Sequence, residues 1–236
     1  MANILELRGV SYSHPGASTK ILQQVDFSTS DKRVGLIGPN GCGKTTLLHL
    51  LVGLNQPEEG QLLFYGQAVE DEKNLRALRK EVGFLFQNSD DQLFSPTVIE
   101  DVAFGPLNLG LSPEEAVERG IATLEQLGLL GFENRNTHHL SGGEKKLVAL
   151  ATILAMQPKM LLLDEPTNNL DPKTRSRLID ILQDLDLHKI IVSHDWDFLS
   201  HTTSTLYQLE NGKLHRCDDD HIHVHRHVHK AGAHLH

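Results

Sequence analysis

Short apolar runs alternate with stretches of helical periodicity along most of the chain. Apolar and polar residues alternate over residues 4–13 and 24–29, which predicts two half-buried strands. Continuous apolar runs at residues 34–37, 160–163 and 190–192 are typical of parallel strands that are buried on both faces. Strands of both kinds, separated by helices, predict an α/β fold.

Several segments carry the periodicity and the end signals of helices. Residues 44–51 follow a glycine-rich loop, and residues 143–156 form a second candidate helix. Ser112 can act as an N-cap, and Glu115 three residues later completes a capping box. Apolar residues recur at helical spacing after Ser112 and again after Asp171, so each of these residues is expected to begin a helix.

A hairpin is predicted near the end of the apolar pattern. Asn211 and Gly212 separate two short apolar strands, and this pair favours the left-handed conformations of a two-residue turn. Beyond Cys217 the composition changes to three aspartates and then to a histidine-rich segment. We expect one domain over residues 1–217 and a separate tail over residues 218–236, with no internal repeat.

Composition narrows the class of protein. The chain has 236 residues, of which 39% are hydrophobic, and a net charge of −9. This charge argues against the basic surface that nucleic-acid binding needs, so no nucleic-acid partner is expected. The sequence shows no signal peptide and no apolar run of roughly 18 residues. With only Cys42 and Cys217 as cysteines, we expect a cytosolic protein whose membrane role, if any, requires partner subunits.

Residues 38–45 match the phosphate-loop pattern, placed between a buried strand and a helix. Glycines let backbone N–H groups turn toward a phosphate, and the helix N-terminus adds its dipole. Lys44 would reach the β- and γ-phosphates of ATP, and the Thr45 hydroxyl would bind Mg²⁺. The residues expected to bind nucleotide here are Gly38, Pro39, Asn40, Gly41, Cys42, Gly43, Lys44, Thr45 and Thr46.

Two carboxylates at the end of the apolar run at residues 160–163 supply the second half of the predicted site. Asp164 at the end of a buried strand could hold the shell of a magnesium ion. Glu165 would orient and partly deprotonate the water that attacks the γ-phosphate. An Asp-Glu pair alone is a weak signal, but its place downstream of a phosphate loop makes an ATPase site the favoured interpretation.

Residues 140–144, Leu-Ser-Gly-Gly-Glu, resemble the signature sequence of the ABC ATPase family. The resemblance implies a RecA-like α/β core with an antiparallel β portion and an inserted helical subdomain at about residues 88–156. It also implies that Ser141, Gly142 and Gly143 contact the γ-phosphate of ATP held by a second subunit, so that the active chain is a homodimer. Glu144 stands where this family usually has Gln, which is expected to add negative charge near that phosphate.

Other positions of the family pattern follow in order. By this resemblance Tyr12 stacks on adenine, and Gln87 contacts Mg²⁺ and senses a membrane partner. Residues 168–171 resemble the loop that crosses the dimer interface, and His194 resembles the histidine that bonds the γ-phosphate. The resemblance extends from residue 3 to about residue 215.

The segment at residues 87–110 is similar to energy-coupling-factor importers, especially to their cobalt and nickel ATPases. This implies a protein on the cytoplasmic face of the membrane whose residues 88–110 receive helices of the integral membrane transport subunits. Apolar residues in the segment could line such a groove or fill the core of the subdomain. They are Leu93, Phe94, Val98, Val102, Phe104 and Leu107.

Every second residue of the tail between residues 221 and 229 is a histidine. An extended chain would place these imidazoles on one face, and imidazole binds Ni²⁺, Co²⁺ and related ions. The residues expected to bind such an ion are His221, His223, His225, His227 and His229. The alternative is a purification tag, although tags are normally uninterrupted histidine runs.

A second function stays open at this point. Residues 164–171 and 193–199 also resemble ABC proteins that act on ribosomes without a membrane partner. Those proteins normally carry two nucleotide-binding units joined by a charged linker, whereas this chain has one unit. The sequence therefore favours an ATPase that energises a nickel or cobalt importer over a non-transport ATPase.

Overall fold

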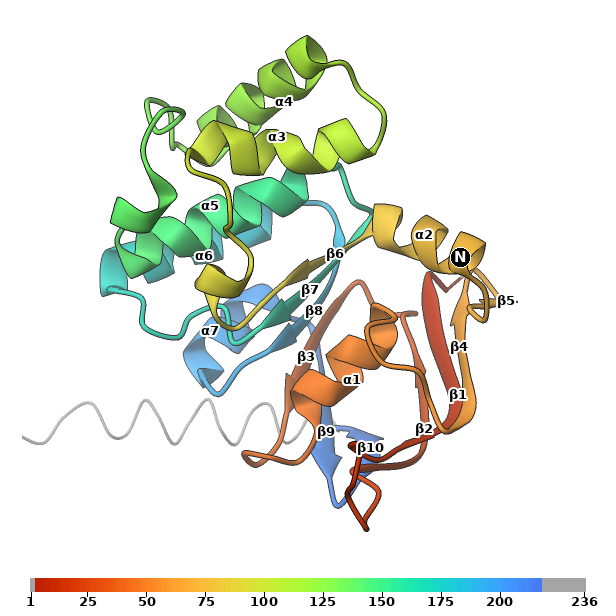
Figure 1. Ribbon diagram of the computed structural model, residues 1–236. Coiled ribbons are helices and arrows are strands. Elements are labelled where there is room, and N and C mark those ends of the chain that lie inside the picture. Colours follow the sequence, from red (N-terminus) through yellow and green to blue (C-terminus); the bar gives the residue numbers. More distant parts are fainter. Residues whose placement is uncertain (1–2, 218–236) are drawn as a thin grey trace, which may run out of the picture. The chain divides into compact units, whose positions relative to one another are not determined.

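A computed structural model describes residues 3–217, which divide into two compact units (Figure 1). The first unit contains residues up to Asn74 and those from Lys189 onward, and the second contains the residues between them. The chain enters the second unit within α2 (Glu72–Glu81) and leaves it at the start of β8 (His188–Val192). The helical subdomain expected at residues 88–156 stays a prediction, because this division falls elsewhere.

An antiparallel sheet forms one part of the first unit. Its strands, in spatial order, are β2 (Leu22–Ser28), β1 (Leu5–Tyr12), β4 (Glu59–Phe64) and β5 (Gln67–Ala68). Alternate residues of β1 and β2, such as Leu7 and Phe27, are buried and paired across the strands. The predicted start of β2 at residue 24 was wrong, because Gln24 has a φ of 49° and a register shift there interrupts the alternation.

Parallel strands form the other part of the first unit. The order is β10 (Lys213–Arg216), β9 (Thr205–Glu210), β3 (Arg33–Ile37) and β8, with β3 parallel to both β8 and β9. The predicted hairpin is confirmed, since Asn211 and Gly212 have φ values of 50° and 75° between β9 and β10. Helix α1 (Lys44–Leu51) follows β3 directly, and α7 (Trp196–Thr202) follows β8.

The second unit begins with a parallel pair of strands, β6 (Val82–Leu85) and β7 (Met160–Asp164). Helix α5 (Gly142–Leu154) lies against β6. A side chain at Gly83 would place its Cβ 2.1 Å from Cγ2 of Ile153, so only glycine permits this approach. Helix α6 (Pro172–Asp184) follows β7 and buries Leu178, Ile179 and Leu182.

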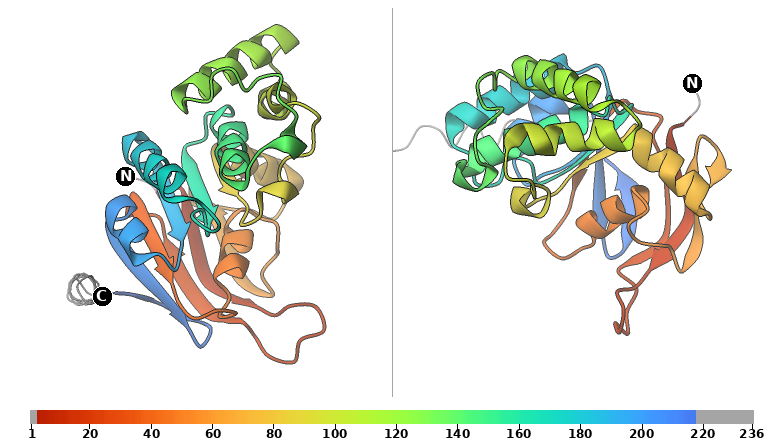
Figure 2. Two further views of the ribbon diagram at one scale, coloured as in Figure 1. Left: turned by 90° about the vertical axis from the view of Figure 1, so that its left-hand side faces the viewer. Right: turned by 45° about the horizontal axis from the view of Figure 1, so that its top comes forward.

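Helices α3 (Val98–Asn108) and α4 (Pro113–Gln126) complete the second unit and lie side by side (Figure 1 and Figure 2). The capping box predicted at Ser112 is present: its hydroxyl accepts the Glu115 N–H, and its own N–H donates to the Glu115 carboxylate. Gly120 lies where the two helices meet, and a Cβ added there would come 2.9 Å from Cδ1 of Ile99. Within residues 3–217 no helix has both the length and the hydropathy needed to cross a membrane.

Candidate nucleotide site

The phosphate loop connects β3 to α1 in the first unit. Its three glycines Gly38, Gly41 and Gly43 have φ values of 152°, 75° and 107°. Residues with a side chain rarely adopt such positive φ values. At Gly38 an added Cβ would lie 2.3 Å from the carbonyl oxygen of Leu209. The backbone can therefore curl tightly only because these positions are glycine.

Lys44 is the first residue of α1 and is only 7% exposed. Its ammonium donates hydrogen bonds to the carbonyl oxygens of Gly38, at 2.8 Å, and Pro39, at 2.9 Å. The loop thus wraps around a single positive charge at a helix N-terminus, and no side-chain oxygen caps that terminus. A fixed cation inside a curled backbone at the positive end of a helix suits the phosphates of a nucleotide.

A chain of side chains joins Tyr12 to α1. The rings of Tyr12 and His14 meet edge to face at 5.5 Å, and Nε2 of His14 lies 3.2 Å from the Thr46 hydroxyl. This contact connects the predicted adenine-stacking residue to the predicted phosphate-binding helix. His14 was not among the predicted residues, since a histidine in an exposed loop gives no sequence signal of its own.

His194 lies at the same edge of the sheet as the phosphate loop. Strands β3 and β8 are parallel and paired from Arg33 with Lys189 to Leu36 with Val192, so their carboxyl ends meet at one edge. Directly after β8, Asp195 caps α7 by accepting the Phe198 N–H at 2.9 Å, which holds the exposed His194 in a short turn. The fold therefore brings the histidine next to the loop within this unit.

In the second unit the predicted carboxylates follow β7. Asp164 is 1% exposed and Glu165 is 6% exposed. Glu165 has a φ of 45°, a left-handed conformation that costs about 1–3 kcal/mol in a non-glycine residue and that is concentrated at functional sites. The parallel pairing of β6 with β7, ending at Leu85 with Leu163, places Gln87 at the same edge of this pair as the carboxylates.

The signature segment begins α5. Ser141 is the N-cap: its hydroxyl accepts the Glu144 N–H at 3.3 Å, and the Glu144 carboxylate accepts the Ser141 N–H at 2.8 Å. Ser141 and Gly142 are exposed. Gly143 is buried, with its would-be Cβ 3.1 Å from Thr174 of α6. The first turn of α5 therefore presents Ser141 and Gly142 outward from a helix N-terminus.

The negative charge of Glu144, expected from the sequence, is paired with a neighbouring arginine. Its second carboxylate oxygen lies 2.7 Å from Nη1 of Arg135, whose guanidinium also stacks 4.1 Å from the ring centroid of Phe132. Arg135 and the Ser141 N–H hold the pKa of Glu144 below its usual range. The carboxylate is therefore paired with Arg135 and bonded to the first residue of its own capping box.

Lys146 was not predicted and is the most buried lysine of the second unit, at 3% exposure. Its ammonium donates to the carbonyl oxygens of Gln87, at 2.7 Å, and Phe86, at 3.2 Å. Burial lowers its pKa to about 8, an effect that the charge of Asp164 opposes. Its sequence signal is a lysine on the apolar stripe of a helix, three residues after Gly143.

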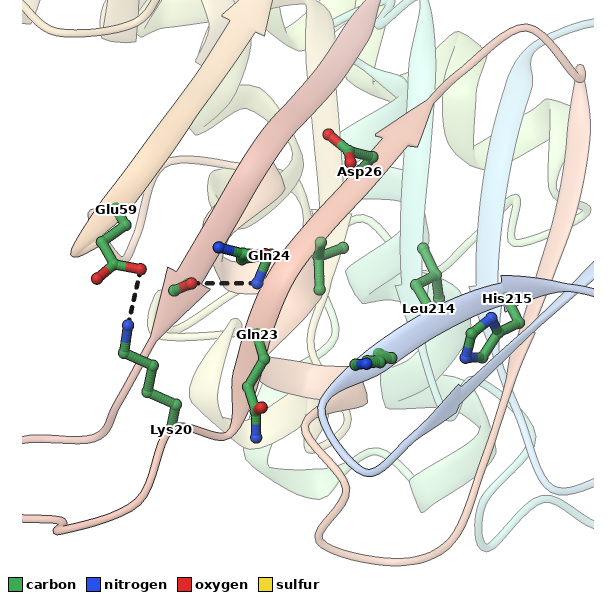
Figure 3. Close-up of a pocket in the computed structure, with 10 residues that line it drawn as sticks. Lys20, Gln23, Gln24, Asp26, Glu59, Leu214 and His215 are labelled. Carbon is green, nitrogen blue, oxygen red and sulfur yellow. Dashed lines mark hydrogen bonds and ion pairs between the residues drawn. The ribbon is translucent and has the colours of Figure 1, made fainter.

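The first unit also contains a hollow of about 530 Å³, lined by β1, β2, β4 and β10 (Figure 3). Lys20 and Glu59 form an ion pair of 2.7 Å at its rim, and the Ser11 hydroxyl accepts the Gln24 N–H at 3.1 Å. Its lining, within the described residues, includes none of the predicted nucleotide-binding residues. Because its charges are of both signs, it gives no concentrated positive charge to a phosphate.

The predicted site residues thus fall into two groups. The phosphate loop, Tyr12 and His194 belong to the first unit, and Gln87, Asp164, Glu165 and residues 141–143 belong to the second. The histidines of the tail and its predicted boundary at residue 218 lie outside the described residues. Among residues 3–217 no group of three or more metal-binding side chains is present.

Comparison with known proteins identifies the fold and the family. Residues 22–168 match the family described as ABC transporter. A putative ABC transporter ATP-binding protein of Nitratidesulfovibrio vulgaris is 54% identical over 99% of this chain and 86% of its own length. The energy-coupling factor transporter ATP-binding protein EcfA of Methanothermobacter thermautotrophicus is 48% identical over 89% of this chain and 69% of its own length.

Solved structures of ABC cassettes are also similar to this chain. The structure of cbiO1 from Clostridium perfringens, part of the ABC transporter complex cbiONQ, has a TM-score of 0.85 and 31% identity, and the match covers 98% of this chain and 94% of that one. The dimeric post-hydrolysis state of the ATP-binding cassette MJ0796, bound to ADP and Pi, has a TM-score of 0.80 and 27% identity over 90% of this chain and 97% of that one. The predicted ABC ATPase fold is confirmed, and the chain belongs to the ABC transporter family as an ATP-binding and ATP-hydrolysing protein.

Proposed function

We propose that this chain hydrolyses ATP as a head-to-tail homodimer and thereby drives a membrane importer of the energy-coupling-factor type. The observation that carries the nucleotide part is Lys44, held by two carbonyl oxygens inside the curled phosphate loop. The importer part is supported by relatives named EcfA and by the cbiO1 structure, described as part of a transporter complex. These names favour the importer over the ribosome-acting alternative.

Within each protomer, we assign the phosphates of ATP to the loop and to Lys44, Thr45 and Thr46. Thr45 is exposed at the start of α1, and the Thr46 hydroxyl is shared with His14. Tyr12, joined to Thr46 through His14, would stack on the adenine ring. His194 would donate to the γ-phosphate from the neighbouring strand end.

A hydroxyl, an amide and a buried carboxylate are hard oxygen donors, which are the ligands that Mg²⁺ prefers. These residue types therefore suit the ion, and we propose Thr45, Gln87 and Asp164 as its ligands. Bound Mg²⁺ would neutralise charge on the phosphates during transfer. Glu165 accepts a proton from the attacking water, a role that suits a carboxylate with a constrained backbone beside Asp164.

The second protomer would complete each site through its signature turn. Ser141 and Gly142 are exposed at the N-terminus of α5, where the helix dipole favours an anion. The Arg135–Glu144 pair keeps the charge next to this turn neutral, so Glu144 would not repel the phosphate. A dimeric arrangement is supported by the dimeric structure of the MJ0796 cassette.

Residues 88–110 carry the proposed surface for the membrane subunits. Leu93, Val98 and Val102 are buried, so these three fill the core of the second unit. Phe94 and Phe104 are 63% and 47% exposed, and their rings meet edge to face at 4.9 Å.

Leu107 is 42% exposed and extends this apolar patch. Asp101 fixes the backbone beneath it, accepting the N–H groups of Phe94 and Ser95. An exposed aromatic pair on a fixed backbone suits an apolar helix of a partner, which would hold the chain peripherally at the cytoplasmic face of the membrane.

Nickel or cobalt is the proposed cargo. The alternating histidines of the tail, His221 to His229, would bind such an ion as neutral imidazoles. Their position beyond residue 217 places them outside the described residues, so this assignment is supported by sequence chemistry alone.

Affinity purification of the chain from detergent-solubilised membranes tests the importer assignment. The wild-type chain should bring down an integral membrane subunit, and Phe104→Asp should lose most of it. Ile121→Asp is a matched control, because Ile121 is an exposed apolar residue on α4, at 38% exposure. Ribosomal proteins in place of a membrane subunit would contradict the proposal, as would equal loss by both variants.

A further inference from the structure

Two adjacent lysines of α5 lie in different environments. The side chain of Lys145 is 19% exposed and forms an ion pair of 2.6 Å with Asp90, whose side chain is 63% exposed. Lys146 is 3% exposed, although lysine is almost never fully buried unless its charge is paired. The buried lysine therefore calls for a physical reason, whereas the partly exposed Lys145 is explained by its ion pair.

The Lys146 ammonium is satisfied by the turn that follows β6. It donates to the carbonyl oxygens of Gln87 and Phe86, at 2.7 and 3.2 Å, and the charge of Asp164 acts on it as well. All of these groups belong to the second unit. One side chain thus joins the helix that starts with the signature turn to the backbone of Phe86 and Gln87.

Gln92 holds the same turn from its other side. Its side-chain oxygen accepts the Phe86 N–H at 3.4 Å, and its side-chain nitrogen donates to Ala149 and Thr152 of α5, each at 3.0 Å. The N–H and carbonyl groups of the turn are therefore both fixed to α5. This double attachment leaves the backbone at Gln87 little freedom to move independently of the helix.

Packing alone does not require a charge at this position. A neutral side chain of similar length could fill the same space, and replacing buried ionic groups by apolar ones is often neutral or stabilising. The ammonium adds a fixed orientation of the turn relative to α5, because it must stay bonded to the two carbonyl oxygens that satisfy it.

We propose that Lys146 is a positioning residue that fixes the backbone of Gln87 to α5, so that the Gln87 side chain and the signature turn move as one body. The inference rests on the proposed role of Gln87 at the magnesium ion. It gives the signature helix a second task besides contact with the partner's nucleotide, since displacement of residues 88–110 by a membrane subunit would reach Ser141 through Lys146.

A double-mutant cycle in the full-length protein tests this assignment. The turnover number at saturating Mg²⁺ and ATP is measured for Lys146→Met, Gln87→Ala and the double variant. Misplacement of a catalytic group by an ångström costs up to roughly 10²-fold, so Lys146→Met should lower turnover by about 10- to 100-fold. The affinity for nucleotide without Mg²⁺ should not change, because Lys146 does not contact the phosphate loop in this account.

If Lys146 acts through Gln87, the double variant will be no slower than Gln87→Ala alone. Multiplied effects in the double variant would overturn the inference and leave the proposed role of Gln87 intact. Wild-type turnover in Gln87→Ala would instead overturn that role, and the inference with it. These two failures are therefore distinguishable.

Two further variants guard against loss of the fold. Lys146→Gln provides a neutral donor able to bind one of the two carbonyl oxygens, so it should show intermediate turnover. It replaces Lys146→Met in the cycle if Lys146→Met unfolds at a lower temperature than the wild type. Lys145→Met removes only a partly exposed ion pair at the surface of α5 and should keep near-wild-type turnover. Equal loss of turnover in Lys145→Met would show that any change on this helix has the same effect, and would overturn the inference.

Discussion

Helices α1 and α5 both begin at glycine-rich turns, yet their N-termini are built differently. The N-cap of α1 is Gly43, which offers no side chain, and the first turn holds the buried cation of Lys44. The N-cap of α5 is Ser141, closed by a capping box with Glu144, whose charge is paired with Arg135.

Under the proposed function, the contrast corresponds to two ways of binding one phosphate. At an uncapped helix N-terminus the backbone N–H groups are available to a ligand, and an enclosed cation adds its charge. Such an end can bind a phosphate without help from another subunit. A capped N-terminus whose charges are paired already has its polar groups satisfied within its own chain. Its exposed turn suits contact with a nucleotide that another subunit already holds. We therefore regard α1 as the binding end and α5 as the closing end of a composite site.

Removing the water-activating carboxylate should have the largest effect and leave both helix ends unchanged. Glu165→Gln should lower turnover by roughly 10²- to 10⁴-fold, the usual contribution of a general base, while ATP binding is kept. Steady-state ATPase assays together with equilibrium nucleotide binding measure the two effects. Turnover near that of the wild type would remove Glu165 from this role.

Breaking the α1 end should act on binding and not on the chemical step alone. Lys44→Ala removes the buried charge that we propose to contact the phosphates, and hydrogen bonds to charged groups contribute about 1.5–3 kcal/mol, or roughly 10- to 100-fold in affinity. Isothermal titration with ATP measures the loss. Lys20→Ala, which removes an exposed ion pair with Glu59, is the control and should bind normally. Retained affinity in Lys44→Ala would contradict the account of α1.

The proposed role of the α5 N-terminus can be tested by changing the charge balance between Arg135 and Glu144. Arg135→Ala leaves the Glu144 carboxylate without its partner and should weaken ATP-driven dimerisation by a few-fold, since partly exposed pairs contribute under about 1 kcal/mol. Glu144→Gln added to Arg135→Ala should restore it, because the unbalanced charge is gone. Dimer affinity at several ATP concentrations decides this, and no recovery in the double variant would contradict the pairing argument.

The same pair predicts a dependence of stability on pH. The pKa of Glu144 is lowered in the folded protein, so the carboxylate contributes stability above its unfolded value of about 4.3. That contribution should be lost as the pH falls through the lower folded value. Chemical denaturation between neutral and acid pH should therefore show a shallower acid loss in Glu144→Gln than in the wild type, and equal slopes would count against the pair.

The smallest effect on hydrolysis is expected from the tail. A chain ending at Arg216 should hydrolyse ATP like the full-length protein but lose nickel binding, with the full-length protein binding Ni²⁺ more tightly than Co²⁺. Affinity should fall as the pH drops through about 6.5, because neutral imidazole is the ligand. Titration of nickel into both proteins measures this. Equal binding by both would remove the tail from metal binding.

How much of this could be predicted depends on how local the signals are. The phosphate loop, the Ser112 capping box and the Asn211-Gly212 hairpin were readable, because each is determined by a few neighbouring residues. Helix α2 was missed, since only Leu78 of it is buried and most of its residues are polar or charged. Helix α3 was also missed, although Thr97 and Glu100 form a readable capping box before it.

The candidate site follows the same division. Motif residues such as Lys44 and Glu165 were found from their spacing in the sequence. Arg135 and Lys146 were missed because their roles depend on partners 9 and 59 residues away in the chain, Glu144 and Gln87. A lysine on the apolar stripe of a helix indicates burial. No local pattern identifies the two carbonyl oxygens of a distant turn as its partners.

The central claim is that each active site combines α1 of one protomer with α5 of the other. Its most direct test is sedimentation of Glu165→Gln with ATP, compared with the same protein carrying Ser141→Arg in addition. The account predicts that Glu165→Gln alone becomes a dimer when ATP is added. The protein with both changes should bind ATP and stay a monomer, because the arginine occupies the place of the opposing γ-phosphate. An unimpaired ATP-driven dimer with Ser141→Arg would contradict the claim, since the signature turn would then not face the partner's nucleotide.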